Sequence, residues 1–303
     1  MPKAHQGLPT ILEHRIPTSG SKPYIITLGP DGNLWFCESG TAKIGRLSPK
    51  EGTFAEFEVP TPGSQPIGII TGADGHLWFT EYSGHKIGRI TLDGAVTEFP
   101  LPTPSAGPNG IILGPDGNVW FSETDAGRIG RITPKGVVTE YAAGISPGSQ
   151  PLAITVAGDD LWFSEAAGNR IAKITMDGIV SEYPAPTPHS GPRAIITGQD
   201  GNLWFVESVG NAIGRMDLRG NAVAFPLPQT AASPRGIALA PNGDFWITEN
   251  AVNRVARLSP TGKILAEYPL PTERSGPRAI MVIPDGRVFF SEHDVGQIGE
   301  IIP

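Results

Sequence analysis

The stretch of sequence that decides the fold is residues 66–99, PIGIITGADGHLWFTEYSGHKIGRITLDGAVTEF. It contains four short runs rich in β-branched and aromatic residues, at residues 66–71, 77–81, 86–90 and 96–99. Asp-Gly pairs, which are typical of hairpin turns, follow the first and the third run. The pattern predicts four antiparallel strands that form one small sheet.

The same unit occurs seven times in the 303 residues. The Trp of a Leu-Trp-Phe-x-Glu segment, or its equivalent, recurs every 42 or 43 residues, at Trp35, Trp78, Trp120, Trp162, Trp204, Trp246 and Phe289. One such sheet cannot cover both of its faces, whereas radial stacking buries the anchors between neighbouring sheets. The repeat therefore predicts an all-β fold, a seven-bladed β-propeller of four-stranded antiparallel blades, with residues 1–303 as a single domain.

The seventh unit lacks its fourth strand, because the chain ends at Pro303 shortly after the third run at residues 297–301. A matching strand is found at the other end of the chain. Residues 11–18, ILEHRIPT, resemble residues 96–103, VTEFPLPT, in their apolar pattern and their closing Pro-Thr. We therefore expect residues 11–18 to supply the closing strand of the last blade, which leaves no open sheet edge.

The amino-acid composition limits the possible binding partners and the cellular compartment of the protein. The chain carries 23 basic and 30 acidic residues, a net charge of −7, and no Lys/Arg run that could follow a phosphate backbone, so we expect no nucleic-acid partner. The single Cys37 cannot form an internal disulfide, which favours the cytoplasm. Residues 1–14 lack the apolar core of a signal peptide, and no stretch approaches the ~20 apolar residues of a membrane span. We expect a cytoplasmic protein without membrane contact.

A glutamate follows the aromatic pair in every unit, at Glu38, Glu81, Glu123, Glu165, Glu207, Glu249 and Glu292. In six units a basic residue follows eight positions later, at Arg46, Arg89, Arg131, Lys173, Arg215 and Arg257. A group that is needed seven times is better explained by structure than by catalysis. We expect these glutamates to pair with the basic residues or with turn amides.

The residue after the proline that opens each innermost strand varies from unit to unit: Tyr24, Ile67, Asn109, Leu152, Arg193, Arg235 and Arg278. Because chain order is ring order in a propeller, three arginines come from consecutive blades beside Tyr24, and we expect them to meet at one mouth of the central channel. Three guanidinium groups suit a carboxylate or a phosphate. Alternatively, each arginine pairs with a glutamate of the adjacent blade and plugs the channel.

The first alternative predicts a site for a small anionic or polar molecule that contains Tyr24, Asn109, Arg193, Arg235 and Arg278 as ligand-binding residues. His293 is a further candidate for a polar contact.

The repeated sequence motifs resemble those of the virginiamycin B lyase (streptogramin B lyase) family over essentially the whole chain. The segments that carry the resemblance are LWFTE at residues 77–81, HKIGRIT at 85–91 and EFPLPTP at 98–104. The resemblance implies a monomeric seven-bladed propeller. It also implies an antibiotic-resistance activity, the magnesium-dependent opening of a cyclic depsipeptide by C–O bond elimination.

The resemblance also implies where such a site would lie. The family has a substrate-binding His after the inner-strand Pro of the sixth blade. In the seventh blade it has a Glu-Pro-His, whose Glu helps to bind magnesium and whose His is the general base, and a second metal-linked Glu after the aromatic pair. The matching positions here are Arg235, then Gly276-Pro277-Arg278, then His293 or, with a one-residue slip, Glu292. Three of the four roles are vacant.

This replacement matters chemically, because imidazole can accept a proton near neutral pH and guanidinium cannot. Arg278 also places a cation beside the expected magnesium. We therefore interpret the chain as a lyase-like propeller whose mouth binds an anionic ligand, and leave open whether it is an enzyme. One alternative is direct streptogramin B cleavage, with His293 as the catalytic candidate and Glu292 as the magnesium ligand. The other is a non-catalytic interaction propeller that uses its rim loops.

Overall fold

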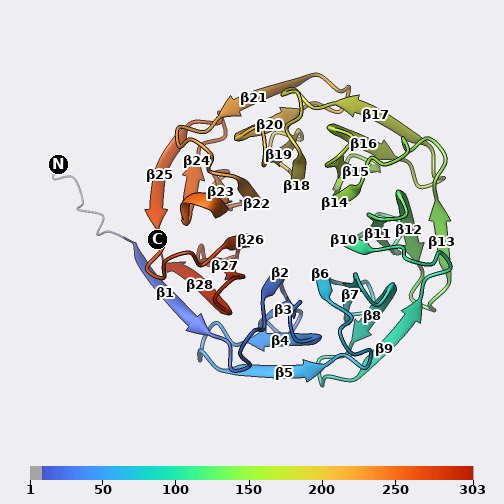
Figure 1. Cartoon of the computed structure of the whole chain (residues 1–303), viewed down its shortest axis with the longest axis horizontal. Helices are drawn as coiled ribbons and strands as arrows, with labels where there is room; N and C mark the ends of the chain where they lie inside the picture. Colours follow the sequence, from blue (N-terminus) through green and yellow to red (C-terminus); the bar gives the residue numbers. More distant parts are fainter. Residues whose placement is uncertain (1–8, 303) are drawn as a thin grey trace.

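The computed structural model describes residues 9–302, which form a ring of seven four-stranded antiparallel sheets around a central channel (Figure 1). Each sheet is one blade, and its strands lie in order from the axis to the rim. The predicted seven-bladed β-propeller is confirmed. Among the described residues there is no helix long and apolar enough to cross a membrane.

The strands occupy equivalent positions in the seven blades. The innermost strands are β2 (Pro23–Leu28), β6 (Pro66–Thr71), β10 (Pro108–Leu113), β14 (Pro151–Ala157), β18 (Pro192–Thr197), β22 (Pro234–Leu239) and β26 (Pro277–Val282). The second strands are β3 (Leu34–Glu38), β7 (Leu77–Glu81), β11 (Val119–Glu123), β15 (Asp160–Glu165), β19 (Leu203–Glu207), β23 (Phe245–Glu249) and β27 (Val288–Glu292).

The outer half of each blade is equally regular. The third strands are β4 (Lys43–Leu47), β8 (Lys86–Ile90), β12 (Arg128–Ile132), β16 (Arg170–Ile174), β20 (Ala212–Met216), β24 (Arg254–Leu258) and β28 (Gln297–Ile302). The outermost strands are β5 (Phe54–Glu58), β9 (Val96–Pro100), β13 (Val138–Tyr141), β17 (Val180–Pro184), β21 (Ala222–Pro226), β25 (Ile264–Pro269) and β1 (Thr10–Arg15). A single 3-10 turn, η1 (Asn250–Val252), interrupts the pattern in the part of the chain that is described.

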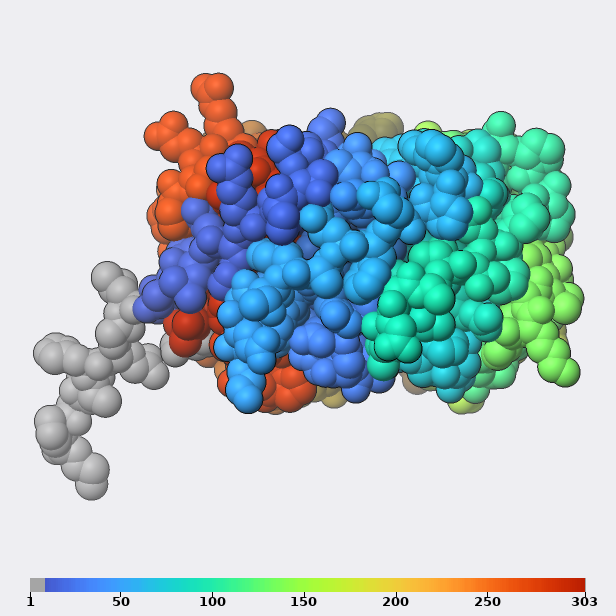
Figure 2. Space-filling view, turned by 90° about the horizontal axis from the view of Figure 1, so that it is seen from below, coloured from blue at the N-terminus to red at the C-terminus, as the bar shows by residue number. Residues whose placement is uncertain are grey.

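The ring is closed as predicted, because β1 pairs antiparallel with β28 in the seventh blade. The strand covers Thr10–Arg15, so the expected range of 11–18 starts one residue late and extends three residues too far. Figure 2 shows the N-terminal strand, in blue, against the C-terminal residues, in red, at the edge of the disc. The His14 Nε2 atom lies 2.8 Å from Glu300 Oε2 across this junction.

The repeated tryptophans form the core between blades, and the repeated basic residues cover them. Trp35 is fully buried and stacks on Phe57, and the Arg46 guanidinium lies 5.3 Å above the Trp35 ring. Arg46 pairs with Asp31 of the first turn, not with Glu38. The expected Glu–Arg pairing is therefore wrong. The reason is the pleat: Trp35 and Glu38 are three residues apart in one strand, so their side chains point to opposite faces of the blade.

The repeated glutamates face a second glutamate from the outermost strand in six blades. In the third blade, burial and the charge of Glu140 raise the pKa of Glu123 to about 8. Both Glu123 carboxyl oxygens are buried and have no hydrogen-bond donor in the described chain. The Glu140 carboxylate accepts hydrogen bonds from the Thr103 N–H and Oγ1, at 3.0 and 2.6 Å. Because Thr103 belongs to the preceding linker, Glu140 fastens one blade to the next.

Candidate functional site

A β-bulge at the start of each innermost strand positions the residues at the mouth of the channel. In the first blade Pro23 is opposite Glu38 and Ile26 is opposite Phe36, so two inner residues, Tyr24 and Ile25, face one partner residue. The same register shift occurs in all seven blades. A bulge releases a side chain from the regular pleat and aims it elsewhere. Here it aims the residue after the proline at the channel.

Hydroxyl side chains hold the bulge in place in five blades. In the second blade the Gly68 N–H donates to Thr80 Oγ1 at 2.8 Å, and Thr80 Oγ1 donates in turn to the carbonyl of Asn109 at 2.8 Å. Equivalent bonds to the bulge N–H are made by Ser122, Ser164, Thr248 and Ser291. Sequence reasoning missed this role, although the Ser or Thr that precedes the repeated glutamate was the available signal.

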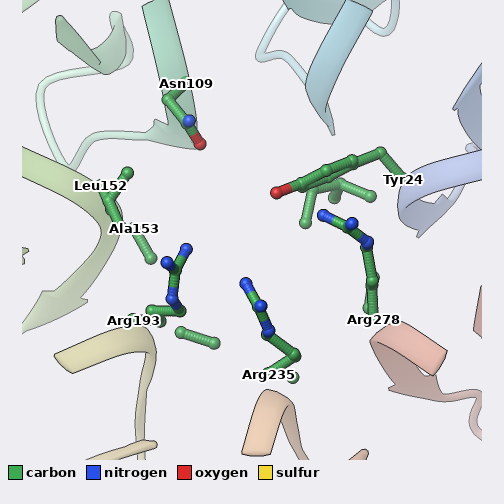
Figure 3. Close-up of a pocket in the computed structure, with 11 residues that line it drawn as sticks. Tyr24, Asn109, Leu152, Ala153, Arg193, Arg235 and Arg278 are labelled. Atoms are coloured by element: carbon green, nitrogen blue, oxygen red, sulfur yellow. The ribbon is translucent and has the colours of Figure 1, made fainter. Parts of the chain in front are cut away.

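The five residues predicted to bind a ligand lie together. Tyr24, Asn109, Arg193, Arg235 and Arg278 line one pocket of about 100 Å³ at the channel mouth. The three guanidinium groups and the Tyr24 hydroxyl point into the same space, and Asn109 lies across from them (Figure 3).

The three arginines form no ion pair within residues 9–302. The Nε atoms of Arg235 and Arg278 are buried and have no hydrogen-bond acceptor there. Burial and the charges of Arg193 and Arg278 lower the pKa of Arg235. The alternative, in which each arginine pairs with a glutamate of the adjacent blade and plugs the channel, is therefore wrong, because the buried glutamates face the outermost strands.

His293 lies beside this pocket and not inside it. The His293 ring meets the Tyr24 ring edge-on at 5.9 Å, and Arg278 lies 5.2 Å above the same Tyr24 ring. His293 Nδ1 lies 2.7 Å from Asp294 Oδ1. Burial, Arg278 and Lys22 lower the pKa of His293, whereas Asp294 opposes the shift. Near neutral pH the imidazole is therefore uncharged.

The positions that the resemblance assigns to magnesium do not fit the metal. Glu292 is fully buried, and burial and Glu13 of the outermost strand raise its pKa to about 7. Gly276 has no side chain, and a Cβ there would lie 2.3 Å from Asp294 Oδ2. Arg278 adds a positive charge. No cluster of three or more His, Cys, Asp or Glu residues suitable for a metal exists in the described region.

Comparison with known proteins agrees with this architecture. The model of the virginiamycin B lyase family matches residues 9–301. A streptogramin B lyase structure is 38% identical, with a TM-score of 0.92 over 97% of each chain. The virginiamycin B lyase of Staphylococcus aureus is 36% identical, with a TM-score of 0.92 over 98% of this chain and 100% of that chain.

A structure of the same S. aureus enzyme, as a catalytically inactive histidine-to-alanine variant with quinupristin, matches equally well, with 36% identity, a TM-score of 0.92 and the same coverage. No curated protein sequence matches this chain significantly. Since the family model and the solved relatives span nearly the whole chain, this protein belongs to the virginiamycin B lyase family.

Proposed function

We propose that this propeller binds a small anionic molecule at the channel mouth through Arg193, Arg235 and Arg278. The observation that carries the proposal is the convergence of three guanidinium groups without an acidic partner in residues 9–302. Like charges held together in a half-buried pocket repel one another, and an anion relieves that repulsion. Arginine forks also match the planar geometry of carboxylate and phosphate oxygens.

The same residues argue against the reaction of the family's antibiotic lyases. The inactive S. aureus variant shows that its activity depends on a histidine. The resemblance assigns the general base of the family to the position of Arg278. A guanidinium group remains protonated at neutral pH and cannot take a proton from the substrate. Any catalysis in this protein would therefore need a different base.

Calorimetry tests the binding proposal. Inorganic phosphate, sulfate and acetate are titrated into the purified protein at low and at high ionic strength. We expect binding that weakens with salt, and at least a tenfold loss of affinity in Arg235→Ala. Arg219→Ala is the matched control, because it removes the same charge from an exposed turn of β20–β21. Anion binding that survives in Arg235→Ala, or no binding at all, would overturn the proposal.

Streptogramin B cleavage is the second candidate, because one observation favours it. His293 is uncharged, hydrogen bonded to Asp294 and close to Tyr24, so its ring could accept a proton. Incubation with quinupristin and magnesium, followed by mass spectrometry, tests this alternative. Ring opening that is lost in His293→Ala would establish a lyase with a relocated base. We expect no ring opening.

A further inference from the structure

The channel mouth is divided into two halves of different chemistry. Blades five, six, seven and one contribute Arg193, Arg235, Arg278 and Lys22, which we call the cationic arc. Blades two, three and four contribute five uncharged residues, which we call the neutral arc: Gln65, Ile67, Asn109, Gln150 and Leu152. The third blade also contributes one carboxylate, that of Asp125. The arcs line two adjoining cavities that share Tyr24, Asn109, Leu152 and Arg278. One ligand could therefore contact both arcs.

The positive charge is concentrated at the mouth. Among the residues that line the two cavities, four cations accompany one carboxylate, that of Asp125. Asp125 Oδ1 already accepts a hydrogen bond from the Tyr82 hydroxyl at 2.9 Å. The chain as a whole has a net charge of −7. The cationic arc is therefore a local feature that selects one end of a ligand.

The neutral arc offers amide groups that can both donate and accept. The side chains of Asn109 and Gln150 make no hydrogen bond to another residue of the described chain. Gln65 Oε1 accepts a hydrogen bond from the Ser83 hydroxyl at 2.7 Å, which leaves its NH₂ group available. An amide that donates and accepts suits hydroxyl groups, which do the same. Ile67 and Leu152 add apolar contacts between the amides.

The two glutamines occupy a backbone position that favours glycine. The residue before the inner-strand proline has a positive φ in all seven blades. Glycine occupies it in three of them, as Gly107, Gly191 and Gly276. The other four have Lys22, Gln65, Gln150 and Ser233, with φ of 48°, 55°, 56° and 50°. A non-glycine residue in this region costs of order 1 kcal/mol. Three of these four side chains, those of Lys22, Gln65 and Gln150, line the mouth, which is consistent with a role for them there.

We propose that the ligand is an acid with a hydroxylated body, such as a sugar acid or a sugar phosphate. Its anionic group lies on the three arginines, and its hydroxyl groups bond to Gln65, Asn109 and Gln150. This inference rests on the proposed anion site and specifies the ligand class. Carboxylate and phosphate versions share the same chemistry, and the experiment below separates them.

The test compares matched pairs of ligands by calorimetry. Acetate is compared with glucuronate, and inorganic phosphate with glucose 6-phosphate, so that each pair differs by the hydroxylated body. Hexanoate supplies an apolar body of similar length. We expect each hydroxylated ligand to bind at least tenfold more tightly than its bare anion, and hexanoate to show no such gain. The hydroxylated ligand that binds more tightly, glucuronate or glucose 6-phosphate, identifies carboxylate or phosphate as the preferred anionic group.

Two variants assign the effect to the two arcs. Replacing Gln65 and Gln150 by alanine together should remove the tenfold gain and leave acetate and phosphate binding unchanged. Arg235→Ala should weaken every ligand. Gln199→Ala is the control, because Gln199 lies in the β18–β19 turn at the opposite ends of the strands. Unchanged thermal unfolding shows that each variant is folded.

The outcomes separate the two proposals. If no anion binds to the wild-type protein, the anion site and the ligand class are both wrong. If acetate and phosphate bind through the arginines but the hydroxylated body adds nothing, the anion site stands and the ligand class is overturned. The same holds if hexanoate gains as much as glucuronate, or if the glutamine variants keep the full gain.

Discussion

Two rings of residues lie side by side around this propeller, each with one member per blade. The buried ring consists of the glutamates that end the second strands, from Glu38 to Glu292, and is glutamate in all seven blades. The mouth ring consists of the residues that follow the inner-strand prolines, from Tyr24 to Arg278, and contains five residue types. In the first blade Glu38 is the register partner of Pro23, so the rings are one residue apart.

The difference shows what each environment demands. Each glutamate of the buried ring has nearly the same surroundings in every blade, so the same residue type is found seven times. The mouth faces an open cavity, so each blade can contribute a different group. Three neighbouring blades contribute arginine, which serves no repeated packing role. The buried ring specifies the scaffold, and the mouth ring is free to specify a ligand.

The fifth blade contains a natural variation of the buried ring. Ala224 stands where the other outermost strands have their second glutamate. Glu207 accepts hydrogen bonds from the Thr187 N–H and Oγ1 there, at 3.3 and 2.6 Å. In the third blade Glu140 accepts the corresponding bonds from Thr103, and the buried Glu123 carboxyl group accepts none. In the blade that lacks the second glutamate, the glutamate of the buried ring therefore binds the preceding linker itself.

The largest expected effect comes from reversing a charge in the mouth ring. Arg235→Glu should lower sulfate affinity about 100-fold or more, because it replaces one of the three cations of a half-buried pocket by a carboxylate that repels the anion. It should not lower the free energy of unfolding in urea, because Arg235 makes no ion pair within residues 9–302 and its removal relieves repulsion. A loss of stability would show that the mouth ring also maintains the scaffold.

The next effect concerns the buried ring and pH. Because the pKa of Glu123 is about 8 in the folded protein, well above its ordinary value, the folded state holds a proton that the unfolded state releases. Its contribution to stability is present below the ordinary pKa and is lost as pH rises toward 8. Glu123→Gln should therefore gain about 1–3 kcal/mol over wild type between pH 5 and pH 9. The free energies of unfolding of the variant and of wild type are measured in urea at both pH values. An equal difference between the two proteins at pH 5 and at pH 9 would refute the prediction.

The same substitution should act differently in the fifth blade. Glu207→Gln removes one of the two carboxylate oxygens that Thr187 bonds, so we expect a loss of about 1 kcal/mol at both pH values. Comparison of the two glutamine variants in one urea series tests whether the presence of a second glutamate decides the outcome. A gain in stability at pH 9 for Glu207→Gln would contradict the distinction between the blades.

The smallest expected effect couples the mouth to pH through His293. Its lowered pKa reflects burial, Arg278 and Lys22, and a bound anion would offset these positive charges. Sulfate affinity should therefore rise a few-fold as pH falls from 7.5 to 5.5, because anion binding favours the protonated imidazole. Sulfate keeps its charge over this range. His293→Gln should remove the pH dependence, and an unchanged slope in that variant would exclude His293 as its source.

Much of the molecule could be predicted from the sequence because a propeller converts chain order into position. The period of 42 or 43 residues specified the seven blades, and the missing strand after residues 297–301 specified closure by the N-terminus. Once the ring was known, Arg193, Arg235 and Arg278 had to come from adjacent blades. Periodicity and chain connectivity suffice for these conclusions, since they do not depend on side-chain contacts.

The tertiary structure alone decided which groups are partners. Arg46 lies over Trp35 and pairs with Asp31. Glu123 faces Glu140, and Arg235 has no carboxylate partner in the described chain. Each result depends on which face of a pleated strand a side chain uses and on what the neighbouring strand or blade presents there. A repeat shows that a residue is needed in every blade, whereas only packing in three dimensions shows what it contacts.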